Sequence, residues 1–230
     1  MLDRRQIVEA AGLAAAAIAV TANSAAAQTP PDGPYQIKPL PFDPKSIKGL
    51  SEKILVSHHD NNYAGAVKRL NAITAQWAAL DVAKAPVFTI NGLKREELMA
   101  MNSMILHEVY FDSLGHGGNP AGALADAIKR DFGSLERWRA EFSAMGKAEG
   151  GGSGWVLLTW SPHDKRLVNQ WASDHTNSVA GGRPILALDM YEHSYHMDYG
   201  ASAGGYVDAF MAAINWDNAA QLFDRYSRQA

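Results

Sequence analysis

The sequence predicts an α+β fold, in which a long N-terminal antiparallel helical hairpin packs on a C-terminal α/β domain with a three-stranded antiparallel sheet. Apolar residues recur at helical spacing through about residues 51–80 and again through 94–114. Later in the chain, three short apolar runs at 153–160, 166–172 and 183–190 are separated by turn residues, as is typical of strands. With 230 residues, 47% of them hydrophobic, the chain can bury a sizeable core.

The first 27 residues have the pattern of a cleavable export signal. An arginine pair, Arg4 and Arg5, precedes an apolar stretch from about residue 10 to 20, and small residues follow at 25–27. The adjacent arginines favour the twin-arginine route and therefore the periplasm, with no membrane span after removal of the signal. The alternative, a buried Ala-rich helix, lacks a polar face with helical period. Residues 28–45 are rich in proline and predict an extended lead-in.

Residues 46–117 are expected to form the helical hairpin domain. Ser51 is a plausible N-cap of the first helix, since its hydroxyl could accept a free backbone N–H of the first turn. The second helix is expected to stop at Gly115, and the turn-rich sequence "APVFTINGL" at 85–93 would join the two.

Residues 118–230 are expected to form the α/β domain with the three-stranded sheet. Two shorter helices come first, with Asn119 and Pro120 at the start of one and Ser134 as cap of the other. The three predicted strands follow, and two helices at about 201–214 and 217–228 close the chain.

Composition narrows the kind of partner and the kind of site. The formal net charge is -3, and the 24 acidic and 21 basic residues are scattered, so no basic surface points to nucleic acid and a small partner is expected. There is no cysteine, so any metal ion must be bound by His, Asp or Glu.

Three histidines and one aspartate could form such a metal site. In "LDMYEHSYH" at 188–196, Asp189 ends an apolar strand and His193 follows four residues later. A buried carboxylate needs a cation or several donors, although Asp189 could equally cap the next turn. His107 lies on an apolar helix, where both ring nitrogens need partners. His58 lies on the stripe of the first helix that would face the second. The four side chains could meet between the hairpin and the sheet.

These segments, in this order, resemble the iron and manganese superoxide dismutases. The resemblance spans about residues 34–228 and includes "PLPFD", the His58 helix ending in "VKRLN", "DFGSLERWRAEF", "GSGWVLLTW", "DMYEH" and "NWDNAAQLFDRY". It implies that His58, His107, Asp189 and His193 bind one Fe or Mn ion per subunit, with water or hydroxide as a fifth ligand. The implied activity converts superoxide to dioxygen and hydrogen peroxide.

The resemblance also implies a group that donates a hydrogen bond beside the metal. Members of the family use a glutamine or a histidine there. Ser103 at the second-helix position is too short, and His175 stands at the strand-side position, so His175 is expected to take this role. Gln170 is the competing candidate, although it stands several residues too early. Trp155 would form part of the apolar wall, or simply pack in the core.

Further implications concern the interface and the entrance to the site. By resemblance, Glu192, His193 and Tyr195 would lie at a homodimer interface. Ala66 stands where the family has a gateway tyrosine, so Asn62 and Tyr63 are candidates for the missing catalytic role.

Two other functions are compatible with the sequence. A superoxide dismutase-like protein that binds metal with weak or no activity would be consistent with Ala66, Asn62 and Ser103. A zinc hydrolase could use the same ligands, but the sequence has no HExxH glutamate to act as its general base.

Overall fold

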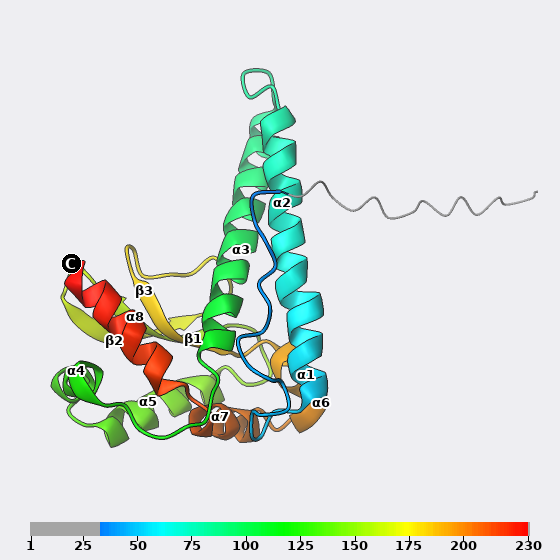
Figure 1. The fold of residues 1–230 in the computed structure, drawn as a ribbon. Coiled ribbons are helices and arrows are strands. Elements are labelled where there is room, and N and C mark those ends of the chain that lie inside the picture. Colours follow the sequence, from blue (N-terminus) through cyan, green and yellow to red (C-terminus); the bar gives the residue numbers. More distant parts are fainter. Residues whose placement is uncertain (1–32, 230) are drawn as a thin grey trace, which may run out of the picture.

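The computed structural model describes residues 33–229, so the predicted export signal lies outside the described residues. A helical hairpin projects from a layer of shorter helices and strands (Figure 1). The hairpin consists of α1 (Glu52–Ser57), the π-helical segment η1 (His58–Tyr63), α2 (Ala64–Ala79) and α3 (Val87–Asp112). The rest consists of α4 (Gly122–Phe132), α5 (Leu135–Ala148), β1 (Trp155–Ser161), β2 (Arg166–Ala172), β3 (Arg183–Asp189), η2 (Glu192–Ser194), α6 (His196–Tyr199), α7 (Ala203–Ala212) and α8 (Trp216–Arg228). This arrangement confirms the predicted α+β fold.

The hairpin begins where the sequence predicts. The Ser51 hydroxyl accepts the backbone N–H of Ile54 at 3.2 Å and so caps α1. Leu70 and Ile73 of α2 pack with Ala100 of α3 in a small apolar cluster between the two helices. Within the described chain, no helix is long and apolar enough to cross a membrane.

Two details of the hairpin differ from the prediction. The first helix is not α-helical throughout, because residues 58–63 form a π-helix, whose hydrogen bonds span five residues. The second helix starts at Val87 instead of about residue 94. Pro86, with φ -59° and ψ 139°, is the N-cap, and its carbonyl accepts the N–H of Thr89. Proline fixes φ near the helical value, so the segment 85–93, which the sequence predicts as a turn, contains the start of a helix.

The sheet has the order β2-β1-β3, and both pairings are antiparallel. The central strand β1 is buried along its whole length. In its register, Trp155 pairs with Ala172 on one side and Asp189 on the other. The sheet therefore brings the end of β3 next to the start of β1.

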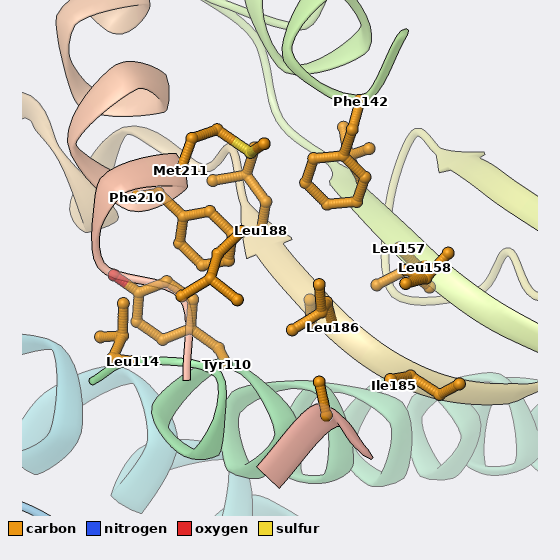
Figure 2. Packing of buried hydrophobic residues seen from close by; sticks show 14 of the residues in the cluster. Tyr110, Leu114, Phe142, Leu157, Leu158, Ile185, Leu186, Leu188, Phe210 and Met211 are labelled. Atoms are coloured by element: carbon orange, nitrogen blue, oxygen red, sulfur yellow. The ribbon is translucent and has the colours of Figure 1, made fainter. Parts of the chain in front are cut away.

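Apolar packing between α3 and the sheet joins the hairpin to the rest of the protein. Figure 2 shows Tyr110 of α3, Leu188 of β3 and Phe210 of α7 in one cluster. The Tyr110 and Phe210 rings are stacked with their centroids 6.1 Å apart, and Phe210 stacks in turn on Phe142 at 6.4 Å. Burying each such side chain contributes roughly 1.5–3 kcal/mol, so this cluster holds α3 firmly against β3.

Candidate metal centre

Four separate elements bring the predicted ligand residues together. His58 opens η1, His107 lies in α3, Asp189 ends β3 and His193 lies in η2. One ligand atom from each residue lies within 4.8 Å of the others. Sequence reasoning left open whether Asp189 caps a turn; its Oδ1 does accept the N–H of Tyr191 at 2.8 Å, which leaves Oδ2 free to face the histidines.

The three imidazoles point at the same carboxylate oxygen. The Nε2 atoms of His58, His193 and His107 lie 3.1, 3.3 and 3.6 Å from Oδ2 of Asp189. Asp189, His58 and His107 are buried, whereas the side chain of His193 is 28% exposed. The ring centroid of His58 lies 5.0 Å from that of His107 and 4.8 Å from that of His193.

The protonation of His107 tests whether a cation fits here. Its Nδ1 lies 2.6 Å from the backbone carbonyl oxygen of Ser103. A carbonyl oxygen can only accept, so Nδ1 carries the proton. Burial lowers the pKa of His107 to about 3, so the ring is neutral and Nε2 holds a lone pair. That lone pair faces the Asp189 carboxylate, and this Nε2 has no hydrogen-bond partner among residues 33–229. A metal ion between the two groups removes the repulsion, so the residues fit a metal.

The electrostatics of the other candidate ligand residues agree with this conclusion. Burial alone would raise the pKa of Asp189, but attraction to His193 and hydrogen bonds with His193 and His58 hold this pKa well below its usual range. Burial lowers the pKa of His58 as well, so its imidazole is neutral and able to bind metal. A neutral nitrogen and carboxylate donor set without thiolate suits Fe or Mn.

His175 lies beside the cluster, with its ring centroid 6.2 Å from that of His107. The indole Nε1–H of Trp155 donates to Nδ1 of His175 at 3.0 Å. Indole nitrogen can only donate, so Nδ1 is the acceptor and Nε2 of the neutral ring carries the proton. Burial lowers the pKa of His175, which keeps the ring neutral. The competing candidate, Gln170, instead lies on the sheet, where its Oε1 is 3.4 Å from the Thr159 hydroxyl.

Sequence reasoning did not find this bond between Trp155 and His175. The available signal was Gly154, the residue immediately before Trp155 at the start of β1. At Gly154 φ is +146°, and an added Cβ would lie 2.5 Å from the carbonyl oxygen of Ala172. Glycine therefore allows Trp155 to stand directly beside Asp189 and His175.

An open cavity of about 360 Å³ lies next to His175. Its lining comes from η1, α2, α3 and the loop after β2, and it includes Asn61, Asn62, Gly65, Ala66, Arg69, Met99, Ala100, Ser103 and His175. The structure therefore brings Asn62, Ala66 and Ser103 to the same cavity as His175.

Tyr63 does not line this cavity. Its hydroxyl accepts the backbone N–H of Lys38 at 3.0 Å and donates to Oε1 of Glu108 at 3.1 Å. Burial raises the pKa of Tyr63 to about 12. The Tyr63 hydroxyl thus both accepts and donates a hydrogen bond in the contact between the lead-in and α3. Tyr63 and His59 line a separate small hollow.

The segment after Asp189 places His193 near the surface. Glu192 is exposed, whereas Tyr195 is 2% exposed and its hydroxyl accepts the N–H of Gly151 at 3.2 Å. Since Nε2 of His193 faces Asp189, Nδ1 of the same ring is directed away from the cluster.

Comparison with known proteins gives consistent matches over most of the chain. Residues 120–222 match the family model of the iron/manganese superoxide dismutases, C-terminal domain. The chain is 72% identical over 189 residues to the superoxide dismutase [Fe] of Cupriavidus metallidurans, which covers 82% of this chain and 96% of that protein. It is 37% identical to the superoxide dismutase [Mn] 1 of Halobacterium salinarum, over 83% of this chain and 96% of the relative. For the superoxide dismutase [Mn/Fe] of Propionibacterium freudenreichii subsp. shermanii, the identity is 32%, over 82% of this chain and 96% of the relative.

Proposed function

Because this chain belongs to the iron and manganese superoxide dismutases, we propose that His58, His107, Asp189 and His193 are the ligands through which it converts superoxide to dioxygen and hydrogen peroxide. The enzyme uses one Fe or Mn ion. The alternative of a relative with little or no activity is not favoured, given 72% identity to an iron superoxide dismutase.

One observation carries the ligand assignment. Three Nε2 atoms converge on one oxygen of Asp189, and the His107 Nε2 meets that carboxylate with a lone pair. A bound iron or manganese ion supplies one-electron redox chemistry, which the side chains themselves lack. The chain contributes the ligands and their orientation, because the carbonyl of Ser103 fixes which nitrogen of His107 is free.

His175 is proposed to orient the reacting molecule by a hydrogen bond from Nε2–H. Trp155 occupies Nδ1, so the proton of the neutral ring stays at Nε2, on the side that a molecule in the cavity can reach. Loss of that proton would leave an imidazolate anion, which is strongly disfavoured in a half-buried site close to the Asp189 charge. His175 therefore acts as a fixed hydrogen-bond donor to the reacting oxygen atoms.

Of the two gateway candidates, Asn62 is proposed to contribute to the cavity. It is half-buried and lines the cavity with His175, so its amide can hold a water molecule there. Tyr63 is assigned a structural role, since its hydroxyl is already bonded to Lys38 and Glu108.

The protein is further proposed to form a homodimer around Glu192, His193 and Tyr195. The exposed Glu192 and the outward Nδ1 of His193 could pair with the same residues of a second copy, as a two-fold axis requires. The buried Tyr195 would support this segment from beneath. Light scattering at micromolar concentration should give twice the mass of the mature chain, and Glu192→Ala should shift the equilibrium toward monomer. A monomeric wild type would refute the proposal.

Periplasmic localisation is also proposed, on the sequence pattern of residues 1–27. Mass spectrometry of the protein from a periplasmic extract should give a mature N-terminus near Gln28. Full-length protein found in the cytoplasm alone would refute it.

The activity is tested on a purified sample whose metal has been quantified. We expect superoxide decay, followed by stopped-flow absorbance, to scale with bound Fe or Mn and to be lost in Asp189→Ala. Full occupancy with no decay above that of free metal would overturn the function.

A further inference from the structure

We propose that Arg69 recruits anions into the cavity, so that superoxide and other small monovalent anions bind beside its guanidinium before they reach the metal ligands. This inference rests on the proposed function, because the cavity matters only if it leads to the reacting centre. Arg69 is neither one of the proposed metal ligands nor a partner of His175.

Arg69 is an exposed residue of the cavity wall. It lies on α2, one turn after Ala66, and both side chains line the cavity together with Asn62 and His175. Among the cavity-lining residues of the described chain, Arg69 is the only one that is positively charged at every physiological pH, because burial lowers the pKa of His175.

The present partner of Arg69 holds it only weakly. Its guanidinium pairs with Glu96 of α3, and the two side chains are 58% and 33% exposed. Exposed pairs of this kind contribute little to stability, so the guanidinium can turn toward an anion at small cost. Glu96 has a second cation close by, since Nη1 of Arg95 lies 3.9 Å from its Oε1. The carboxylate thus keeps a partner when Arg69 turns away.

The net charge of this surface does not explain attraction of an anion. Arg69 and Arg95 are balanced by Glu96 and by Asp174, whose pKa is lowered first by hydrogen bonds from Thr176 and also by Arg95. Attraction of an anion must therefore come from the position of the Arg69 guanidinium at the cavity wall, and not from a net positive charge of the surrounding surface.

Small residues form part of the wall that Arg69 and His175 share. Gly65, Ala66 and Ala100 line the cavity together with Ser103 and His175. The volume of about 360 Å³ compares with roughly 30 Å³ for one water molecule in the liquid. The cavity that Arg69 and His175 both line therefore has room for a small anion.

The test compares Arg69→Gln with Arg95→Gln in the iron-loaded protein. Both variants remove one exposed charge from the same ion cluster, but only Arg69 lines the cavity. The probe is azide, a small monovalent anion, and its dissociation constant is measured by visible absorption at 20 and 200 mM ionic strength. We expect Arg69→Gln to weaken azide binding about threefold to tenfold at low salt, with a smaller salt dependence than the wild type. Arg95→Gln should change it by less than about 1.5-fold.

A third variant, Glu96→Gln, frees the guanidinium and should strengthen azide binding about twofold. Equal effects of Arg69→Gln and Arg95→Gln, or no effect of Arg69→Gln, would overturn the inference. Superoxide decay is measured on the same samples as a separate readout. Arg69-dependent azide binding in a protein without dismutation would refute the proposed function and would support only the recruitment of a small anion by Arg69.

Discussion

The bond between Trp155 and His175 gives the sharpest prediction for catalysis. In Trp155→Phe, His175 loses the donor that fixes its tautomer, since indole Nε1 lies 3.0 Å from Nδ1. The change removes roughly 40 Å³ of a fully buried side chain, which costs about 1 kcal/mol at about 24 cal/mol per Å³. The unpaired Nδ1 adds about 1–3 kcal/mol, so the variant should be about 2–4 kcal/mol less stable. Loss of a hydrogen-bond partner of a metal ligand typically lowers activity about 10–100-fold, and we expect a fall of about tenfold for His175, which lies beside the ligand residues.

Trp138→Phe is the matched control for this prediction. Trp138 is equally buried, and its Nε1–H donates to Oδ1 of Asn169 at 3.0 Å, away from the four ligands. Denaturant unfolding should give similar losses of stability for the two variants. Stopped-flow superoxide decay per bound metal should fall only in Trp155→Phe. Equal activity of the two variants would refute the role assigned to the His175 tautomer.

Three further outcomes follow from the structure. Tyr63→Phe should lower the free energy of unfolding by about 1–2 kcal/mol, because the N–H of Lys38 and the carboxylate of Glu108 lose a hydrogen-bond partner. The variant should keep the wild-type kcat. A large fall in kcat would return Tyr63 to the catalytic site. Ala66→Tyr should alter kcat less than about threefold, because His175 already supplies a hydrogen-bond donor in the cavity. A large rise in kcat would show that the wild type lacks a functional gateway residue. Burial raises the pKa of Glu149 to about 7 from 4.5, so the wild type should lose stability as the pH rises through that interval. Chemical denaturation should therefore find Glu149→Gln more stable than the wild type by about 1–2 kcal/mol at pH 8 but not at pH 4. Equal pH dependence of the two proteins would contradict this.

Much of the fold could be predicted from periodicity. The three strands lie within two residues of the predicted runs, and Ser51 and Ser134 cap helices as expected, because short apolar runs between turn residues and capping residues act locally. Pro86 was misinterpreted since proline is compatible with both a turn and a helix start. The π-helix at 58–63 has no periodic pattern of its own in the sequence, because it is a short π-helical segment between two α-helical segments of one continuous helix.

The site was predictable in its ligand residue types but not in its finer orientation. His107 and Asp189 could be singled out since a buried imidazole and a buried carboxylate need partners. The direction of Tyr63 depends on contacts with Lys38 and Glu108, which are distant in the sequence. The Trp155 bond to His175 likewise depends on how β1 and the loop after β2 meet, which no local pattern encodes.

The central claim is that one Fe or Mn ion binds among His58, His107, Asp189 and His193. An anomalous difference map from crystals of the metal-loaded protein, collected at the absorption edge of the metal found by elemental analysis, tests it directly. We expect one strong peak per chain, within bonding distance of the three Nε2 atoms and of the Asp189 carboxylate. A peak elsewhere, or a fully metallated and active sample with no peak among these four residues, would contradict the account.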